Sequence, residues 1–412
     1  MTDTLAPEFH AELTALFNAD PAVLSDPYPL YAKLRDQPVL HWNGIAVVSR
    51  HADVLRVLRD PDVFSARRHL GSRVANRRAE LDAEGQARLQ EVVDHEALWL
   101  TQNDDPEHKR LRGLANLAFT RRRVADMRGM IEDLVQELLG PARERGSMEL
   151  VQEASFPLPL LVISAMLGAP KEDAELIRGW SDEIALAIGT TYANLDRAYE
   201  AVESFRHYVA ALIDSRRGEP GTDLFTVLVN AEQDGERLSR DELVAMFVLL
   251  LFAGHETTTN LMSNAVVALI RNPDQQQRLR HDPALIAGAT EEFLRYCNSV
   301  HAIHRVALVD TEIGGVPVSA GTTVRIMLTA ANHDPAVFSD PERMDVTRQD
   351  VNKQVGLGFG IHTCLGAWLL RLETEVLVKA MLDFPVLDLE DETVPRPNFL
   401  LAGPQAVQLR LR

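Results

Sequence analysis

The sequence predicts a mainly α-helical fold with small β-sheets. Apolar residues recur at helical spacing through residues 124–215 and again across 239–272. β-Branched residues gather instead in short runs, as at 39–42 and 45–48, which indicate small hairpins. No linker rich in Gly, Ser or Pro and no internal repeat interrupts the chain, so we expect one domain over residues 1–412.

Composition argues against several classes of protein. The formal net charge of −18 disfavours nucleic acid and anionic membranes as partners. Two cysteines far apart in the chain, Cys297 and Cys364, predict a reducing compartment and no disulfide framework. Residues 1–8 lack the regions of a signal peptide, and the most apolar run, Leu243–Gly254, is too short to span a bilayer. We therefore expect a soluble, cytoplasmic monomer.

Short elements are expected in the first hundred residues. Residues 1–25 show only a weak helical pattern, and helices are predicted through Leu34 and over 52–58. Residues 64–100 are charged and mixed, and the arginines from Arg67 to Arg78 are typical of a solvated surface.

Helices should fill the middle of the chain. An aspartate before a proline opens one of them, and His108 and Arg112, four residues apart, share one of its faces. Taken alone, such a pair is more often two solvent-exposed surface residues than a binding site. Breaks are expected at Gly140-Pro141, Gly168–Pro170 and Gly218–Gly221.

The longest predicted helix runs from the capping box Ser239–Glu242 toward Asn272. At about 1.5 Å per residue it would cross the whole domain. Its middle, Ala253–Thr259, contains a glycine and three threonines, which weaken a helix. Thr257 is expected to bond back to the carbonyl of Ala253 and bend the helix, and the simplest interpretation leaves Glu256 solvated.

A helix and several hairpins complete the C-terminal third. The helix contains Glu292 and Arg295, which at this spacing normally form a surface ion pair. A hairpin turn is predicted at Ile313–Val316, a strand at 324–328 and a last hairpin over 399–411.

Residues 356–366 are the stretch around which the other elements are organised. Glycines at 356, 358 and 360 favour neither strand nor helix and predict a tight loop. Helical spacing begins directly after Cys364, so this cysteine lies near the positive end of a helix, where backbone N–H groups favour a thiolate. The loop is therefore predicted to present one sulfur anion.

Several interpretations of Cys364 compete. A lone cysteine is most often a small buried residue, and a zinc site would need more ligands than two cysteines suggest. A Cys-His nucleophile would take its histidine from elsewhere in the chain. A dinucleotide loop fails, because Ile361 stands where the last glycine of G-x-G-x-x-G belongs. Axial ligation of haem iron is the remaining interpretation.

The loop resembles the haem loop of the cytochrome P450 family, written F-x-x-G-x-H-x-C-x-G. Gly360, His362, Cys364 and Gly366 match it, whereas Leu357 replaces the phenylalanine that packs beside the sulfur in relatives. The resemblance implies the cytochrome P450 fold, haem b (iron protoporphyrin IX) as cofactor, and Cys364 as the axial ligand of the iron. In that family the thiolate pushes electron density toward O–O cleavage.

Two further motifs follow the order of the same family. The stretch Ala253-Gly254-His255-Glu256-Thr257 is similar to A-G-x-[DE]-T, which implies that Glu256 and Thr257 deliver protons at the oxygen site. Glu292 and Arg295 fit E-x-x-R, a buried ion pair behind the haem, and Arg343 fits its third partner.

The resemblance also assigns contacts to haem and substrate. The residues implied to contact haem are His108, Arg112, Ala253, Gly254, Arg305, Gly358, His362, Cys364 and Gly366. Those implied to line an apolar substrate pocket are Leu249, Phe252, Ala253, Val300, Ile303 and Leu400. His301, His304 and the Arg67–Arg78 stretch border the substrate in relatives, so a contact there stays open beside an ordinary polar wall and a solvated surface.

The implied function is a haem-thiolate monooxygenase. It would insert one oxygen atom from O2 into a hydrophobic small molecule, by hydroxylation or epoxidation, with secondary metabolites among the candidates. The sequence carries no flavin or iron–sulfur motif, so electrons are expected from NAD(P)H through ferredoxin reductase and ferredoxin. A basic face of Lys109, Arg110 and Arg121–Arg123 should steer an acidic ferredoxin.

Three alternatives remain beside this function. An H2O2-driven haem-thiolate peroxygenase and a haem-thiolate gas-binding sensor would not need the acid-alcohol pair, so Glu256-Thr257 argues against both. A Cys-His hydrolase is the alternative without haem, and the absence of a haem spectrum would favour it.

Overall fold

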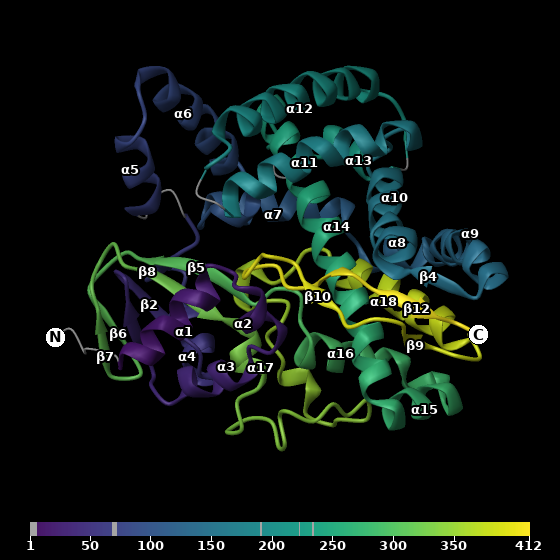
Figure 1. Ribbon diagram of the computed structural model, residues 1–412. Helices are drawn as coiled ribbons and strands as arrows, with labels where there is room; N and C mark the ends of the chain where they lie inside the picture. Colours follow the sequence, from purple (N-terminus) through teal and green to yellow (C-terminus); the bar gives the residue numbers. More distant parts are fainter. Residues whose placement is uncertain (1–5, 68–71, 190–191, 222, 233–234) are drawn as a thin grey trace.

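Helices dominate the computed structural model, which describes residues 6–67, 72–189, 192–221, 223–232 and 235–412 (Figure 1). The predicted mainly α-helical fold with small sheets is confirmed. The α-helices are α1 (Pro7–Phe17), α2 (Pro21–Ser25), α3 (Tyr28–Arg35), α4 (His51–Leu58), α5 (Ser72–Ala79), α6 (Ala83–Ala97), α7 (Glu107–Ala118), α8 (Arg121–Asp126), α9 (Arg128–Arg145), α10 (Pro157–Met166), α11 (Ala174–Gly189), α12 (Leu195–Arg216), α13 (Leu224–Asn230), α14 (Arg240–Arg271), α15 (Pro273–His281), α16 (Ile286–Tyr296), α17 (Leu328–Asn332) and α18 (Ala367–Leu382).

The strands are short and form several small sheets. They are β1 (Leu40–Trp42), β2 (Ile45–Val48), β3 (Phe64–Ser65), β4 (Ser147–Glu149), β5 (Ala302–Ala307), β6 (Thr311–Ile313), β7 (Val316–Val318), β8 (Thr323–Met327), β9 (Asp388–Leu389), β10 (Val394–Pro395), β11 (Pro404–Ala406) and β12 (Gln408–Arg410). The largest sheet has the order β1-β2-β8-β5-β3, and only its β2–β8 pair is parallel. The predicted hairpins at β1–β2 and β6–β7 are confirmed.

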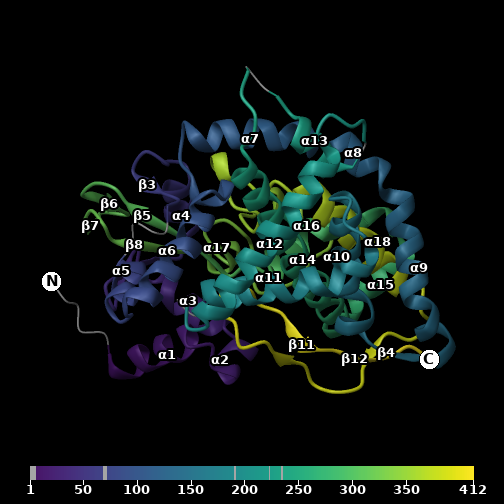
Figure 2. The same cartoon turned by 90° about the horizontal axis from the view of Figure 1, so that it is seen from above.

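Helix α14 runs through the middle of the fold and contacts α10, α12 and α18 (Figure 2). The predicted capping box is confirmed: the Ser239 hydroxyl accepts the N–H of Glu242 at 3.2 Å, and the Glu242 carboxylate accepts the N–H of Ser239 at 2.7 Å. By length and composition alone α14 could cross a membrane, but 67% of its most apolar window is buried inside the protein. Helix α14 is therefore a core helix, and α10, α12 and α18 pack against it.

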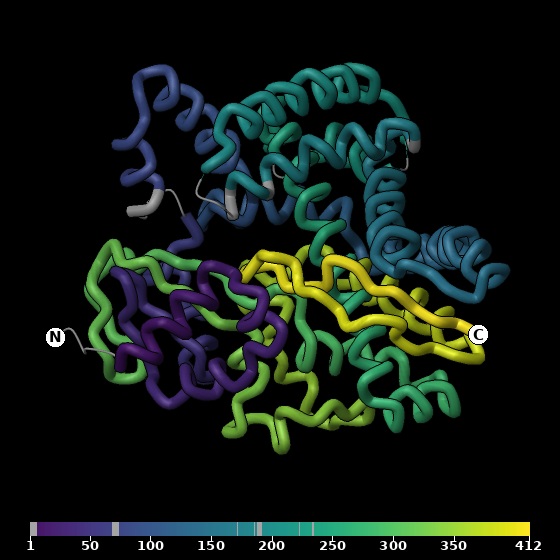
Figure 3. Tube along the Cα trace, in the orientation of Figure 1, coloured from purple at the N-terminus to yellow at the C-terminus, as the bar shows by residue number. Residues whose placement is uncertain are grey.

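The remaining elements surround α14 on two levels. In Figure 1, helices α11, α12 and α13 lie in the upper part of the molecule. Helices α16 and α18 lie lower than these three helices and pack against α14. After α18 the chain crosses one face of the molecule as an extended segment, yellow in Figure 3, and brings β12 beside β4. This arrangement leaves the loop before α18 next to the middle of α14.

The sequence pattern underestimates helix content near the N-terminus. Residues 1–25 contain α1 and α2, and Leu13 and Leu16 of α1 are fully buried. The charged stretch 64–100 contains α6, whose N-terminus is capped when the Asp82 carboxylate accepts the Gly85 N–H at 2.8 Å. In both places, a narrow apolar stripe among charged residues was enough to make a helix.

The break predicted at Gly140-Pro141 is wrong. Helix α9 continues through Pro141 and ends at Gly146, whose φ of +79° is the usual left-handed C-terminal conformation. Proline removes one backbone hydrogen bond, but its neighbours Leu139 and Ala142 are fully buried, so packing outweighs this local cost. The break at Gly168, with a φ of +64°, is confirmed between α10 and α11.

Candidate active site

The loop before α18 is shaped by its packing against neighbouring backbone. Gly358 and Gly360 have φ angles of +73° and +76°, which other residues rarely adopt. A Cβ on Gly360 would lie 2.7 Å from the carbonyl oxygen of Leu58, so only glycine fits there. The Cys364 N–H donates to the Leu357 carbonyl at 2.9 Å and closes the loop. Cys364 is thereby fixed just before the N-terminus of α18.

Cys364 lies on a cavity between its loop and α14. Leu249, Ala253 and Thr257 of α14 line the same cavity. Ala253 is exposed although α14 is a core helix, because it borders this cavity. A Cβ on Gly366 would meet no atom within 4 Å, so the cavity is open beside the start of α18 as well. The fold therefore places one sulfur and the middle of α14 around a common space.

Two effects oppose each other at the Cys364 thiol. Burial raises its pKa, whereas the Gly366 N–H and the guanidinium groups of Arg112 and Arg371 lower it. Burial prevails, so the helix start alone does not favour the thiolate as the sequence predicted. A cation bound to the sulfur is the kind of group that would reverse this balance.

Four basic side chains meet beside the cavity. The rings of His108 and His362 are 4.2 Å apart between centroids, and their Nε2 atoms are buried without a hydrogen-bond partner among the described residues. The pKa of His362 is lowered to about 3 by burial and by the positive charges of Arg305, His108 and Arg112. Burial also lowers the pKa of Arg305 to about 10. Buried cations and unpartnered ring nitrogens of this kind fit an anionic ligand.

Glu256 and Thr257, although adjacent in sequence, have different surroundings. Thr257 lines the cavity, and its hydroxyl donates to the Ala253 carbonyl at 2.8 Å, as predicted. Glu256 is instead placed near Arg396 and Asp182; burial raises the pKa of its carboxyl, and Arg396 lowers it. The acid therefore lies near charged groups and, among the described residues, does not line the cavity, whereas the alcohol does.

Comparison with known proteins assigns the family. A family model described as Cytochrome P450 matches residues 192–409. Cytochrome P450 107B1 of Saccharopolyspora erythraea is 36% identical over 409 residues, which cover 97% of this chain and 98% of that protein. The chain belongs to the cytochrome P450 family. PikC of Streptomyces venezuelae, named a P450 monooxygenase, is 35% identical over 94% of this chain and 92% of its own.

Solved structures confirm the P450 fold. PksS of Bacillus subtilis 168 superposes with a TM-score of 0.85 at 30% identity, covering 96% of this chain and 99% of its own. P450BioI, solved with an acyl carrier protein that bears hexadec-9Z-enoic acid, gives a TM-score of 0.86 at 30% identity over 95% and 100%. This P450 is therefore an enzyme of a monooxygenase family, whose members use haem iron, O2, a hydrophobic substrate and a redox partner.

The residues of this P450 fit a haem. A thiol facing the cavity offers the one protein ligand that the family's iron requires. The two histidines with unpartnered Nε2 atoms, together with Arg112 and Arg305, offer donors for the two propionates. The exposed side of Ala253 and the open space beside Gly366 leave room for the ring between them.

A buried ion pair stands in α16, as the E-x-x-R motif predicted. The Arg295 Nε donates to the Glu292 carboxylate at 2.7 Å, and both side chains are fully buried. The prediction that Arg343 is the third partner is wrong. The guanidinium of Arg348 lies 3.2 Å from the Glu292 carboxylate instead. A turn in which the Arg343 N–H donates to the Asp340 carbonyl leaves the Arg343 side chain exposed. Its carbonyl accepts from Arg295 and Arg348 at 3.2 and 2.9 Å.

Replacing Arg348 by alanine is expected to destabilise this P450 by about 3 kcal/mol, because Glu292 loses one of the cations that balance its buried charge. Arg343→Ala is the matched control, since it removes only an exposed side chain and should change the unfolding free energy by less than about 0.5 kcal/mol. Urea denaturation followed by circular dichroism measures both. Equal effects of the two substitutions would contradict the assignment of Arg348.

Only some of the residues predicted to line the substrate pocket lie on the cavity of Cys364. Leu249 and Ala253 line the cavity of Cys364, and so does Ile163 of α10, which no motif pointed to. Phe252 packs against Trp99 with ring centroids 5.6 Å apart. The other three predicted pocket residues do not line this cavity among the described residues and stay predictions; they are Val300, Ile303 and Leu400.

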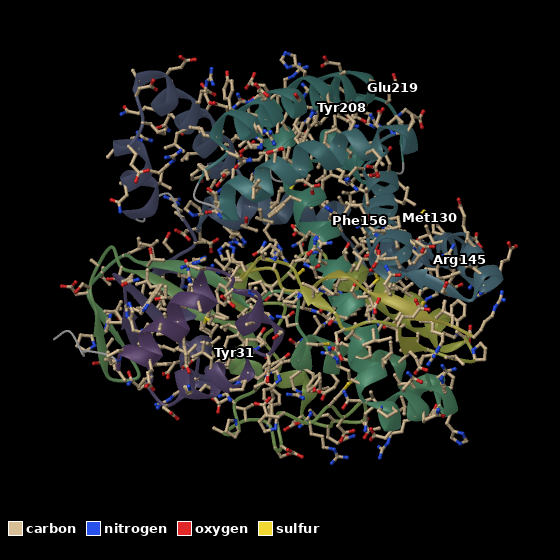
Figure 4. All side chains as sticks on the ribbon, in the orientation of Figure 1. Tyr31, Met130, Arg145, Phe156, Tyr208 and Glu219 are labelled. Carbon is tan, nitrogen blue, oxygen red and sulfur yellow. The ribbon has the colours of Figure 1, made fainter. Side chains whose placement is uncertain are left out.

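The two histidines near the pocket have partners in the protein. Nδ1 of His301 lies 2.7 Å from the hydroxyl of Tyr31, which Figure 4 labels, and burial lowers the pKa of His301 to about 4. The Arg325 Nε donates to the His304 Nε2 at 3.1 Å. Both contacts favour the polar-wall interpretation over a substrate contact.

The basic stretch from Arg67 to Arg78 also has protein partners where it is described. Arg67 lies 3.6 Å from the Asp104 carboxylate, and Arg77 lies 3.0 Å from Glu80. Arg68 and the side chain of Arg73 lie outside the described residues. These pairs agree with the solvated-surface interpretation of the stretch.

Proposed function

We propose that this P450 is a haem b monooxygenase that inserts one oxygen atom from O2 into a hydrophobic small molecule, by hydroxylation or epoxidation. The observation that carries the proposal is the shared cavity: Cys364 and Thr257 line it, and four basic groups gather beside it. The haem, when bound, supplies the activation of O2. The protein positions the haem and the substrate, excludes water and delivers the protons.

The chain's residues hold the cofactor in two ways. Cys364 would ligate the haem iron, and the Gly366 N–H and the charges of Arg112 and Arg371 favour its anionic form. His108, Arg112, Arg305 and His362 would hold the propionates, because their buried side chains would gain charge-assisted hydrogen bonds there.

Proton delivery is assigned to Glu256 and Thr257. Burial raises the pKa of the Glu256 carboxyl, and the positive charge of Arg396 partly offsets this effect. A positioned carboxyl of this kind can act as a general acid or base toward a neighbouring water or hydroxyl. Ordered water carries the proton from this carboxyl to the Thr257 hydroxyl on the cavity.

Similar proteins support the substrate class. Relatives are named Polyketide biosynthesis cytochrome P450 PksS, Steroid C26-monooxygenase and Vitamin D(3) 25-hydroxylase, at 35%, 36% and 36% identity. These names and the apolar cavity favour a hydrophobic substrate, with secondary metabolites included. We further propose a cytoplasmic, monomeric single-domain enzyme that takes electrons from ferredoxin and ferredoxin reductase.

The decisive experiment compares two oxidants. Holoenzyme with ferredoxin, ferredoxin reductase, NAD(P)H and isotope-labelled O2 is expected to convert a substrate, chosen from ligands that shift the haem spin state, into product carrying one labelled oxygen. Product formed only with H2O2 would favour the peroxygenase. Binding of O2 or CO with no oxygenated product from either oxidant would favour the sensor.

A further inference from the structure

A second cavity lies on the C-terminal half of α14. Its volume of about 370 Å³ is typical of a small-molecule site. Its walls come from residues 24–28, the end of α14, residues 296–301 at the end of α16, and the extended segment 392–404. Figure 2 shows α2 beside this extended segment, and α2 contacts β10. Among the described residues, the second cavity shares no lining residue with the cavity of Cys364, so the two are separate spaces.

Flat rings form part of the wall of the second cavity. The rings of Tyr28 and Tyr296 are nearly parallel, with 18° between their planes and 6.5 Å between their centroids. The Tyr28 hydroxyl donates to the Tyr296 carbonyl at 3.1 Å, which fixes the Tyr28 ring in this position. Three proline rings add further flat apolar surface, those of Pro27, Pro395 and Pro404. A wall of aromatic and proline rings favours a planar ligand.

The second cavity carries one uncompensated positive charge. Of the two arginines that line it, Arg271 lies 3.3 Å from the carboxylate of Glu392, which also lines the cavity. Arg396 has no ion-pair partner among the described residues, and its Nε donates to the Pro404 carbonyl at 3.3 Å. His301 on the same wall is neutral at pH 7, because burial lowers its pKa to about 4. The guanidinium of Arg396 is therefore available to an anionic ligand.

A buried amide beside the second cavity also lacks a partner. Asn260 of α14 is 1% exposed, and neither polar atom of its side-chain amide has a hydrogen-bond partner among the described residues. The amide lies against Gly403 of the cavity wall, where a Cβ would overlap the Asn260 Oδ1. Asn264, one helical turn further along α14, lines the cavity itself. A buried amide of this kind calls for a bound water or ligand next to it.

We propose that the second cavity is a binding site for a small aromatic carboxylate. The ligand's carboxylate pairs with Arg396, and its ring packs against the rings of Tyr28 and the prolines. A guanidinium with no protein carboxylate and a flat wall in one cavity together match the two ends of such a molecule.

A ligand in the second cavity would act on the candidate active site through Arg396. The Glu256 carboxyl lies near Arg396 and Asp182, and Asp182 in turn lies near His255 and Arg178. A ligand carboxylate beside Arg396 would offset its positive charge, so the pKa of Glu256 would rise and the carboxyl would stay protonated up to a higher pH. This effect rests on the proposed function, because it requires Glu256 to deliver protons, whereas the binding itself does not.

Calorimetric titration with 2-naphthoate tests the site, on holoenzyme in which an azole ligates the iron and fills the haem cavity. One 2-naphthoate is expected to bind per protein, and the uncharged 2-naphthamide to bind about tenfold more weakly, because it forms no ion pair. Arg396→Gln should weaken 2-naphthoate about tenfold and leave 2-naphthamide unchanged. Ala268→Phe, which fills the cavity from its α14 wall, should weaken both ligands. Arg410→Gln is the matched control, since Arg410 is exposed on β12 and pairs with Asp388, and it should change neither.

Loss of 2-naphthoate binding when the azole is present would overturn the second site, because the ligand would then occupy the haem cavity. Binding that is unchanged in both Arg396→Gln and Ala268→Phe would overturn it as well. The effect on Glu256 is measured separately, as the pH dependence of turnover with and without saturating 2-naphthoate. An upward shift in the parent enzyme that is absent in Arg396→Gln is expected. Binding without such a shift would overturn the link to Glu256 alone, whereas a parent enzyme that forms no oxygenated product without 2-naphthoate would contradict the proposed function.

Discussion

Replacing Cys364 by histidine is expected to abolish both the thiolate spectrum and the monooxygenase activity. The reduced holoenzyme with CO should show a strongly red-shifted Soret band, and Cys364→His should lose it. Histidine can ligate iron, but it is neutral and cannot push electron density toward the O–O bond as a thiolate does. Optical spectra of the CO complex, with haem content measured beside them, check the expectation.

The chain offers a matched control for this experiment in its other cysteine. Cys297 is buried, and burial raises its pKa far above the ordinary thiol value, so it is inert packing. Cys297→Ala should therefore retain the thiolate spectrum. Persistence of that spectrum in Cys364→His, or its loss in Cys297→Ala alone, would show that the axial ligand has been misassigned.

The sequence was most informative where local chemistry decides structure. The capping box at Ser239–Glu242 defined the start of α14, and the bond from Thr257 to Ala253 followed from the spacing of four residues. The glycines around Cys364 predicted a tight loop. Their cause, however, lies elsewhere in the chain: Gly360 is required by the backbone of Leu58.

The sequence was least informative where partners come from distant segments. Nothing near Glu292 indicates that Arg348 rather than Arg343 completes its ion pair, because a turn at Asp340 decides which side chain points inward. Arg110 belongs to a run of basic residues, yet Glu242 of α14 neutralises it. Residue type predicts which groups can interact, whereas the pairs that form depend on tertiary packing.

The surroundings of Glu256 show the same limit and refine its predicted role. Sequence motifs put the acid and the alcohol side by side, but only Thr257 lines the cavity. Glu256 is coupled to Arg396, which lies beyond α18 in the C-terminal segment. The segment between β10 and β11 thereby contributes to the electrostatics of the proposed proton route. The hairpin predicted over 399–411 is wrong, because β11 pairs with β10 whereas β12 pairs with β4 and β9.

Substitutions at Thr257 and Glu256 are expected to affect different quantities. Thr257→Ala removes the hydroxyl on the cavity, so haem content and substrate binding should be nearly unchanged while more NAD(P)H ends as H2O2 and less as oxygenated product. Glu256→Gln keeps shape and burial but cannot carry the proton, so it should mainly slow turnover. A tenfold loss of rate corresponds to about 1.4 kcal/mol of barrier.

Product formed per NAD(P)H oxidised, with peroxide assayed in the same samples, separates these effects. Ser263→Ala is the matched control: its hydroxyl makes the same kind of bond to the Thr259 carbonyl at 2.8 Å on the same helix, and among the described residues Ser263 does not line the cavity. If only the backbone bond mattered, Thr257→Ala and Ser263→Ala would lose coupling equally, whereas a proton role predicts a loss at Thr257 and none at Ser263. Unchanged coupling and rate in Thr257→Ala and Glu256→Gln would reduce the pair to a feature of the helix and favour a peroxide-driven enzyme.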